Sequence, residues 1–368
     1  MLYLIFLIAT ISVMNGAKYQ SLAGFIHSDF GFPIHKIALL FSLSNICGLI
    51  FGLVILGLPY VRARVFIFGK FLYLVQILII TITILFQKYF SAMIIQRILE
   101  GVVFSFIMNF YPVAISNLVQ KKQREVLLCF WGLVYAAGFS LSNGLALIKI
   151  PAEYIYYMPA VSLTILLMLY NNKIISYANE YDNMCTHPAK TNKQISRRLI
   201  FISIPFFLFT MLYNNFIFSF SKHQGQNFEL FWFMMLNGVG IIISNIIISL
   251  RVFNSTRYLL VLVIFSAFVV PFLNIDSVYF SGFFLFNLGL IEGVIFGYFI
   301  NHFSTQEVSL VKASYLVSGS LGATIGPLVN INYGSLSIFT SIIFLSALIS
   351  LFCLSLEEMR RMNLTEGS

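Results

Sequence analysis

The chain alternates between long apolar blocks and short hydrophilic gaps along its whole length. Each block holds about 20 residues, which as a helix crosses a hydrocarbon core of about 30 Å. Because lipid offers the backbone no hydrogen-bond partners, each block should form a helix. We therefore expect twelve spans, near residues 2–25, 36–57, 65–86, 90–116, 126–148, 153–171, 199–220, 229–250, 258–275, 279–302, 310–331 and 334–355.

One hydrophilic gap is much longer than the others and runs from residue 172 to 198. It follows the sixth block and predicts an all-α integral membrane fold with two bundles of six helices. The expected N-terminal bundle covers residues 1–171 and the C-terminal bundle residues 199–356, with a tail at 357–368. We expect the central loop and the tail to be cytoplasmic.

The composition agrees with a membrane protein, with 59% hydrophobic and 10% charged residues, against roughly a quarter charged in soluble domains. The net charge of +9, with 40 Phe and 19 Tyr, also suits a nucleic-acid partner. However, 16 of the 22 Lys and Arg lie in the gaps on the side shared by both expected termini. Positive charge marks the cytoplasmic side of such loops. The charge therefore predicts orientation in a lipid bilayer and no nucleic-acid binding, and the short loops suggest a prokaryotic inner (plasma) membrane.

The sequence indicates no cofactor and no metal site. The four cysteines have no CxxC spacing, and no two of the five histidines share a helix face at ligand spacing. No GxxxxGK[ST] motif for nucleotide binding occurs. The apolar N-terminus lacks the basic region of a signal peptide and extends too far for one, so we interpret it as the first span.

The two halves share a sequence repeat with an offset of 192 residues. Glu100-Gly-Val-Val-Phe104 in the fourth expected span matches Glu292-Gly-Val-Ile-Phe296 in the tenth. The same offset relates two further residues of the second span to two of the eighth, namely Asn45 to Asn237 and Gly48 to Gly240. Parallel six-helix halves related by an axis along the membrane normal are a known transporter architecture.

Taken together, the chain resembles a major facilitator superfamily transporter. The resemblance covers nearly the whole chain through its twelve spans, central loop and repeated halves. Locally, Arg97-Ile-Leu-Glu100-Gly101 is similar to the family pattern of Arg, two residues, Gln or Glu, then Gly. The resemblance implies a substrate cavity lined by spans four and ten, among others, and a protein that works as a monomer.

A second family pattern lies between spans two and three, where a cytoplasmic loop usually reads Gly, three residues, Asp-Arg, one residue, then Gly-Arg. Here Gly57 and Arg62 fit this loop motif, but Val61 replaces the Asp. In the family that Asp belongs to a charge network thought to latch the outward-open state. Because the Asp is missing, the resemblance does not extend to a conventional latch.

Glu100 and Glu292 both fall near the expected membrane midplane, where carboxylates are costly and usually functional. Glu100 lies about ten residues, or about 15 Å, into its span. Arg97 is one helical turn away. Glu100 therefore has two equal alternatives: it forms half of an ion pair, or it binds substrate or a proton.

Glu292 differs from Glu100, because no basic residue occurs in its span. Burial without a counter-charge suits a group that binds and releases protons, so we hypothesise that Glu292 is the main proton-coupling site and Glu100 the second candidate. The alternative for Glu292 is a permanently neutral carboxyl group that bonds a neighbouring helix.

The polar residues Asn15, Lys18 and Tyr19 form a cluster in the first span. Lys18 has three alternative roles: its ammonium snorkels to the interface, pairs with Glu100, or contacts an anionic substrate.

We assign this cluster to substrate binding together with Arg97, and with Tyr213 and Asn214 of the seventh span. These residues are also suited to helix contacts alone.

Three function classes follow from the sequence. A secondary transporter that moves a small organic solute with protons fits best. A membrane sensor or binding protein on the same scaffold is the alternative. An intramembrane enzyme is disfavoured because no HExxH or GxSxG motif is present.

Overall fold

The computed structural model describes most of the chain. The described residues are 1–57, 67–119, 123, 127, 130–147, 150–184, 193–221, 227–250, 255–269, 278–301, 308–329 and 333–366. Within them the chain is helical and contains no strand, as the apolar blocks predict.

A helix occupies the described part of every expected span. The long helices are α1 (Leu2–Ser21), α3 (Ile34–Gly57), α5 (Leu72–Phe86), α6 (Phe90–Leu118), α8 (Leu133–Leu147), α9 (Ala152–Met184), α10 (Lys193–Ser221), α11 (Asn227–Ser249), α12 (Ser255–Val269), α13 (Val278–Asn301), α14 (Val308–Leu328) and α15 (Tyr333–Glu366). A short 3-10 turn, η1 (Phe130–Gly132), precedes α8.

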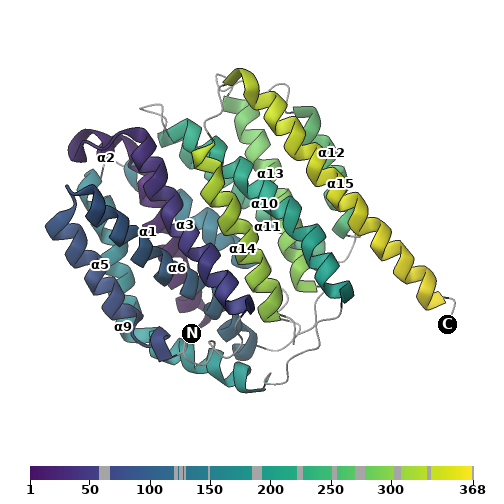
Figure 1. The fold of residues 1–368 in the computed structure, drawn as a ribbon, viewed down its shortest axis with the longest axis horizontal. Helices are drawn as coiled ribbons and strands as arrows, with labels where there is room; N and C mark the ends of the chain where they lie inside the picture. The colour runs from purple at the N-terminus through teal and green to yellow at the C-terminus, as the bar shows by residue number, and fades with distance from the viewer. Residues whose placement is uncertain are drawn as a thin grey trace.

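The first expected span ends earlier than the sequence indicates. α1 ends at Ser21, and a separate short helix, α2 (Ala23–Phe30), leads on to α3. Gly31 caps α2 in the left-handed conformation, with φ of 70°, and Pro33 directly precedes α3. Glycine adopts this conformation without a Cβ clash, and proline cannot continue the preceding helix. The sequence Gly31-Phe-Pro33 therefore turns the chain at this end of the molecule (Figure 1).

Much of the expected central loop is also helical. α9 continues to Met184, and α10 already begins at Lys193. Ile174 and Ile175 explain the extension of α9, because both are buried in the same hydrophobic cluster as residues of α1 and α6. Likewise, α15 continues through the expected tail to Glu366.

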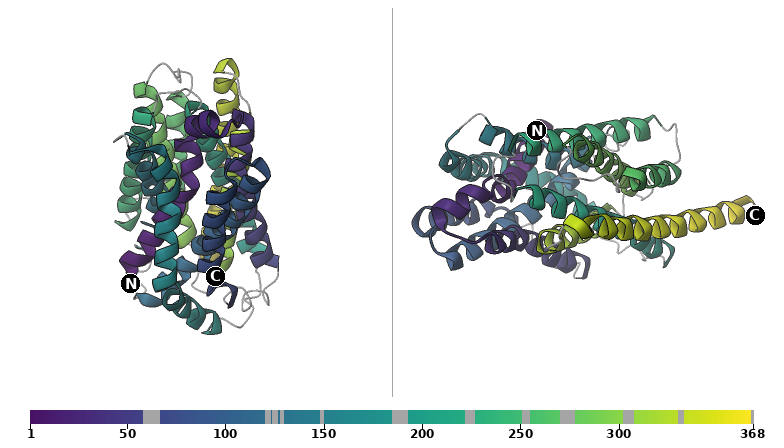
Figure 2. Two further views of the ribbon diagram at one scale, coloured as in Figure 1. Left: turned by 90° about the vertical axis from the view of Figure 1, so that its left-hand side faces the viewer. Right: turned by 90° about the horizontal axis from the view of Figure 1, so that it is seen from above.

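The helix contacts of the first half recur in the second. α3 packs on α6 as α11 packs on α13, and α1 contacts α8 and α9 as α10 contacts α14 and α15. Figure 1 shows the first half in purple to blue at one side and the second in green to yellow at the other, and Figure 2 places both chain ends at the same end of the molecule. The repeated packing agrees with the offset found in the sequence.

Two glycines of that repeat occupy equivalent close contacts. A Cβ on Gly101 of α6 would lie 2.6 Å from the Ser44 backbone oxygen of α3. A Cβ on Gly293 of α13 would clash with Ser244 of α11. Small residues let membrane helices approach closely. The glycine after each repeated glutamate therefore brings equivalent helix pairs together.

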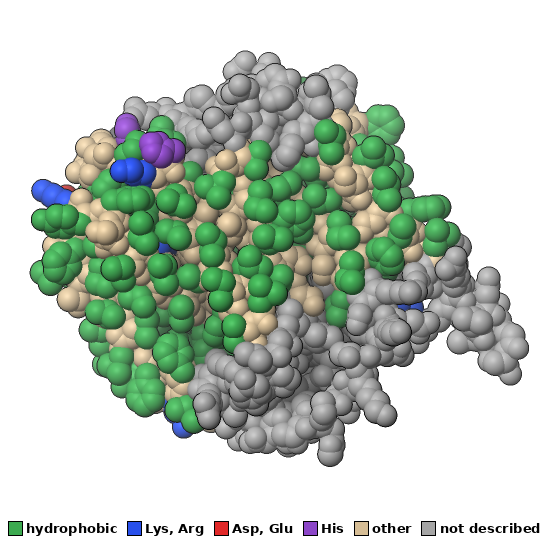
Figure 3. Space-filling view, viewed as in Figure 1, with side chains coloured by type: hydrophobic (Ala, Val, Ile, Leu, Met, Phe, Trp, Pro, Cys, Tyr) green, Lys and Arg blue, Asp and Glu red, His purple; other side chains and the backbone are tan. Residues whose placement is uncertain are grey.

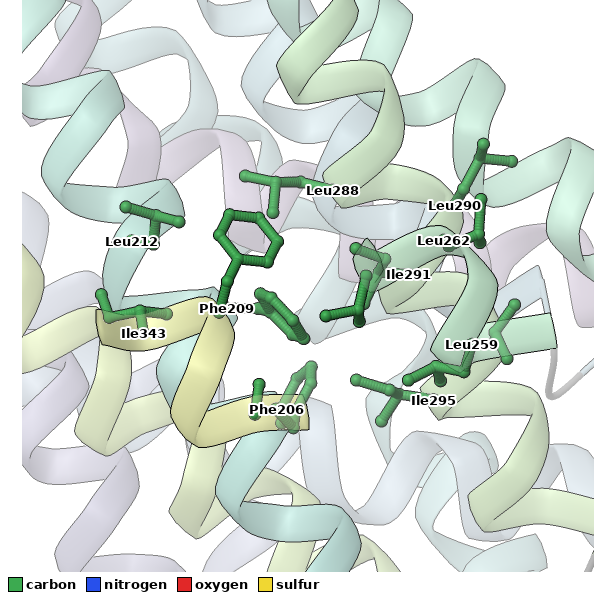
Figure 4. Packing of buried hydrophobic residues seen from close by; sticks show 14 of the residues in the cluster. Phe206, Phe209, Leu212, Leu259, Leu262, Leu288, Leu290, Ile291, Ile295 and Ile343 are labelled. Carbon is green, nitrogen blue, oxygen red and sulfur yellow. The ribbon is translucent and has the colours of Figure 1, made fainter. Parts of the chain in front are cut away.

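Each half has its own buried hydrophobic cluster. In the second half, the cluster joins α10, α12, α13 and α15, as the labelled side chains in Figure 4 show. Phe206 and Phe209 of α10 face Ile291 and Ile295 of α13 there. Two further clusters lie in the first half, between residues 5 and 175.

Two helix pairs make the most extensive contacts between the halves. α3 lies along α14, where Ser42 Oγ donates to the Thr324 backbone oxygen at 2.9 Å. α8 lies along α11, and beside this pair Phe139 and Tyr213 meet edge to face across the boundary.

The outer surface of the helices is apolar. Figure 3 shows hydrophobic side chains across the described face, with few charged ones. By length and composition, the described residues contain six helices able to cross a membrane, at Leu2–Tyr19, Ile34–Phe51, Phe90–Pro112, Ala152–Tyr177, Arg198–Ile217 and Phe231–Ile248. Shorter apolar helices lie at Leu72–Phe86, Thr256–Val269, Tyr279–Ile295 and Thr340–Leu356. These features support a multi-pass membrane protein.

Candidate functional site

A cavity of about 120 Å³ lies between the two halves, near the middle of the helices that line it. Its walls come from α1, α3, α5, α6, α8 and α9 on one side and from α10, α11, α13 and α14 on the other. Aromatic rings make up much of the wall, namely Phe41, Phe104, Tyr135, Phe139, Phe206, Phe209, Tyr213 and Tyr315.

Most of the predicted site residues line this cavity. They are Asn15, Arg97, Glu100, Tyr213, Asn214 and Glu292. Lys18 and Tyr19 are fully buried beside it, and neither is among the described residues that line it. Gly57 ends α3 far from the cavity, and Arg62 lies outside the described residues.

Lys18, Arg97 and Glu100 form a buried charge cluster on the first-half side of the cavity. Lys18 Nζ lies 3.0 Å from Glu100 Oε1, and Arg97 Nη1 lies 2.5 Å from Glu100 Oε2. Gln96 Nε2 also donates to Oε1 at 3.0 Å. Both oxygens of Glu100 are therefore occupied by donors in this structure, so Glu100 is part of an ion pair here. Lys18 is not exposed and does not snorkel to the membrane interface.

Arg97 also ties α6 to α3. Its Nε donates to the Leu40 backbone oxygen at 2.8 Å, and Nη2 donates to Ser44 Oγ at 2.6 Å. Its guanidinium lies 4.1 Å from the centre of the Tyr19 ring. A planar group with several fixed donors suits these simultaneous contacts better than a lysine ammonium.

The partners of Lys18 come from three helices. Nζ donates to Asn15 Oδ1 of α1 at 2.9 Å, pairs with Glu100 of α6, and lies 4.6 Å from the centre of the Tyr156 ring of α9. Tyr156 and Tyr19 share a hydroxyl hydrogen bond of 3.0 Å. The predicted cluster of Asn15, Lys18 and Tyr19 thus joins three helices of the first half.

Glu292 lies on the opposite side of the same cavity in a different environment. Among the described residues it forms no ion pair, and Arg97 is the basic residue that lines the cavity with it. Tyr135, Tyr213 and Tyr315 line the same cavity as Glu292. Three helices, α8, α10 and α14, supply these tyrosines.

The repeat explains why the two glutamates differ. The residue equivalent to Arg97 in the second half is Gly289. A Cβ at Gly289 would clash with the Asn237 backbone oxygen of α11, so an arginine does not fit there. The same helix position thus carries a neutralised carboxylate in one half and, in the other, a carboxylate that forms no ion pair with any described residue.

Sequence reasoning did not select several residues that build the site. Gln96 precedes Glu100 by four residues, and this helical spacing is a signal that could have identified it. Ser44 bonds Arg97 only through the packing of α3 on α6. Tyr135 and Tyr315 have no distinguishing spacing among the 19 tyrosines. Asn237, the repeat counterpart of Asn45, also lines the cavity.

Among the described residues no group of three or more His, Cys, Asp or Glu side chains forms a candidate metal site.

The cavity combines apolar rings with two separated charged regions. Such a concave, mostly apolar site with a few polar groups is typical of small-molecule binding.

No protein-family profile and no curated protein sequence matches the chain. Its structure is similar to that of the human organic anion transporter MFSD10 (TETRAN), with a TM-score of 0.61 and 14% sequence identity. The match covers 97% of this chain and 98% of that protein. MFSD10 is a major facilitator superfamily transporter. The resemblance found in the sequence is therefore confirmed at the level of the fold.

Proposed function

We propose that this protein, which has the fold of a major facilitator superfamily transporter, is a secondary active transporter of a small organic solute. The observation that carries the proposal is the cavity between two equivalently packed halves. One wall holds a carboxylate in an ion pair, and the other holds a carboxylate that has no ion pair within the described part of the chain. Rocking of the halves would expose this cavity to each side of the membrane in turn.

The membrane arrangement follows from the same proposal. The twelve long helices of the described residues would all cross the membrane, as an N-terminal bundle and a C-terminal bundle of six. Both termini would face the cytoplasm, because most Lys and Arg lie in the gaps on their side. We place the protein in a prokaryotic inner membrane and expect it to work as a monomer.

Glu292 is the proposed proton-coupling residue. It faces the cavity without a basic partner among the described residues, whereas Glu100 is engaged by Lys18, Arg97 and Gln96. A carboxyl group that is not tied to a cation can gain and lose its proton as the cavity changes its exposure. Glu100 is therefore the second candidate for coupling.

The test compares the small-molecule contents of cells and medium for wild type, Glu292→Gln and an empty vector at equal membrane levels. Glu153→Gln is the matched control, because Glu153 is an exposed carboxylate at the start of α9, outside the cavity. We expect wild type and the control to redistribute one solute, and a proton uncoupler to abolish this redistribution.

The outcomes separate the function classes. A solute that wild type redistributes and Glu292→Gln does not supports proton-coupled transport through this site. Equal redistribution by both proteins would contradict the role of Glu292 and make Glu100 the next candidate. If wild type redistributes no solute, the sensor or binding protein becomes the better account.

A further inference from the structure

The cavity wall carries neutral amide side chains besides its charged groups. Asn45 of α3 and Asn214 of α10 both line it, so one amide comes from each half of the molecule. Asn214 is among the site residues predicted from the sequence, whereas Asn45 was recognised only as a position of the internal repeat. The contacts of both side chains indicate what they can bind.

The amide of each asparagine is oriented by a bond to its own helix. Asn45 Nδ2 donates to the Phe41 backbone oxygen at 3.3 Å, and Asn214 Nδ2 donates to the Thr210 backbone oxygen at 2.8 Å. A backbone oxygen only accepts, so these bonds distinguish the nitrogen from the oxygen of each amide. No described residue bonds either Oδ1, and each amide keeps one further N–H. Each side chain therefore has an acceptor and a donor left to offer.

The next residue, Asn215, shows a purely structural use of the same side chain. Its Nδ2 donates to the backbone oxygens of Gly326 and Val329 at 2.8 and 2.6 Å, which ties α10 to the end of α14. Asn215 does not line the cavity, and its Oδ1 is sealed within the protein. Asn214 is also buried, at 6% exposed, but it lines the cavity and its Oδ1 is not sealed in this way. Asn215 thus fixes the helix that carries Asn214.

α3 holds Asn45 beside the middle of α14. Ser42 Oγ donates to the Thr324 backbone oxygen at 2.9 Å. Two turns along α3, a Cβ on Gly48 would lie 3.4 Å from Ser320 Cβ. Asn45 lies midway between Ser42 and Gly48 in the chain, so it stands at the level of the turn from Ser320 to Thr324.

Asn214 meets the same part of α14 from α10. A Cβ on Gly326 would lie 2.9 Å from Asn214 Cβ. The two asparagines are therefore held about one helical turn apart along α14. At this level α14 presents Gly319 and Ala323 to the cavity, and these small residues leave space for a solute group next to both amides.

The charged groups next to Asn45 are already engaged. Arg97 uses four of its five N–H donors, on the backbone oxygens of Leu40 and Phe41, on Glu100 and on Ser44. Both oxygens of Glu100 hold donors. The amides of Asn45 and Asn214 are thus better placed than these charges to bind a polar group of the solute.

Building on the proposed transport function, we propose that Asn45 and Asn214 bind the solute, and that the group they bind is a neutral hydroxyl or carboxamide. Such a group both donates and accepts hydrogen bonds, as the two amides require. A carboxylate has no proton to donate to Oδ1, and an ammonium has no lone pair to accept from Nδ2. Because the asparagines belong to different halves, the bound group contacts both.

The apolar part of the solute would rest on the rings beside Asn214. Phe139 and Tyr213 line the cavity and meet edge to face across the boundary between the halves. The cavity holds about 120 Å³, and an engineered protein cavity of about 150 Å³ accepts benzene. A small alcohol or amide with a compact apolar body matches this size.

Two other cavity groups define the alternatives. Asn237, the repeat counterpart of Asn45, donates from α11 to the Leu285 backbone oxygen of α13 at 3.2 Å, so its amide joins two helices. Glu292 forms no ion pair with a described residue and suits a cationic group. Preferential binding of a cation is therefore a distinct outcome of the test.

The test uses four probes with the same branched body: isobutyramide, isobutyrate, isobutyramidinium and 3-methylbutan-2-one. The amide is neutral and both donates and accepts, the ketone only accepts, and the other two carry a negative and a positive charge near pH 7. Dissociation constants come from the melting temperature of the purified full-length protein as a function of probe concentration, at equal ionic strength.

We expect isobutyramide to bind wild type most tightly. The ketone should bind about threefold to tenfold more weakly, which is the effect of one lost hydrogen bond. Asn45→Leu and Asn214→Leu should each narrow this difference. Asn109→Leu is the matched control and should keep it, because Asn109 Nδ2 donates to the Ser105 backbone oxygen of its own helix at 2.9 Å and Asn109 does not line the cavity.

Four results would overturn the inference: no binding of isobutyramide, tighter binding of either charged probe, equal binding of amide and ketone, or the wild-type preference retained in both asparagine variants. The first three need no variant, so they decide even if a variant does not fold. The result is separable from the proposed transport function. If isobutyramide binds as expected but cells redistribute no solute, the amide site stands without transport. If cells redistribute a solute that has neither hydroxyl nor amide, the transporter stands and this inference falls.

Discussion

Lys18 Nζ lies 3.0 Å from Glu100 Oε1, although the two residues are 82 positions apart in the chain. The contact joins α1 to α6, and Arg97 extends it to α3. An ion pair at this depth gives the first half a fixed polar centre. In the facing half, Glu292 forms no ion pair with the residues that the structure describes, so we propose that this half is the one whose charge changes.

Replacing Glu100 should destabilise the fold more than replacing Lys18. Glu100→Gln removes the anion that Lys18 and Arg97 share, and losing one partner of a buried pair costs about 3–5 kcal/mol. Lys18→Met keeps the neutral pair of Arg97 and Glu100 and should cost less. Thermal unfolding in detergent measures both changes, with the exposed Glu153→Gln as the control. An unfolding temperature for Glu100→Gln equal to wild type, or lower stability of Lys18→Met, would refute this role.

Gly101→Ala should lower stability because the new Cβ would meet the Ser44 backbone oxygen at 2.6 Å. Overpacking of this kind costs about 1–3 kcal/mol. Gly24→Ala is the matched control, since no heavy atom lies within 4 Å of its added Cβ. Unfolding temperatures of the two variants should therefore differ clearly. If the unfolding temperatures of the two variants are equal, the close packing of α3 on α6 is not needed for stability.

A disulfide between positions 48 and 320 should link the two halves and stop transport. A Cβ on Gly48 of α3 would lie 3.4 Å from Ser320 Cβ of α14, close to the separation of about 3.5–4.5 Å found in disulfides. The variant Gly48→Cys/Ser320→Cys is made with the four native cysteines replaced by serine and with a protease site inserted between Met184 and Lys193. After oxidation and cleavage the halves should migrate together on a gel, and reductant should separate them.

Transport of the solute found by profiling is then measured before and after reduction. The linked protein should be inactive and should recover on reduction, because alternating access requires the halves to move against each other. Gly48→Cys alone serves as the control for the substitution and the oxidant. Full activity in the linked state would rule out a rocking movement at this contact.

The helices were predictable because the length of an apolar block is a local property of the sequence. The end of α9 was not predictable in this way. The helix continues through a polar run, where Ile174 and Ile175 are buried against residues of α1 and α6. The separate helix α2 ends at a turn formed by Gly31 and Pro33. Apolar content alone does not reveal this helix, because it predicts only the first span and the connection that follows it.

The site was predictable where a charge stands out in an apolar helix, as for Arg97, Glu100 and Glu292. The pairing of Lys18 with Glu100 was not predictable from the sequence. The depth of Lys18 in α1 suits a side chain that extends to the membrane interface as well as one that pairs with Glu100, and the packing of α1 on α6 decides between the two. Tyr135 and Tyr315 line the cavity with Glu292 from two other helices, and no local spacing in the sequence indicates that they share it.

The central claim is that Glu292 carries the proton that drives transport. A comparison of proton-driven solute accumulation by wild type and Glu292→Gln tests it most directly. Wild type and variant are placed in liposomes with the solute found by profiling, and uptake under a proton gradient is compared with exchange of labelled for unlabelled solute. Wild type should accumulate the solute and exchange it. Glu292→Gln should still exchange it but should not accumulate it, since its side chain cannot carry the proton. Accumulation by the variant to the wild-type level would contradict the account.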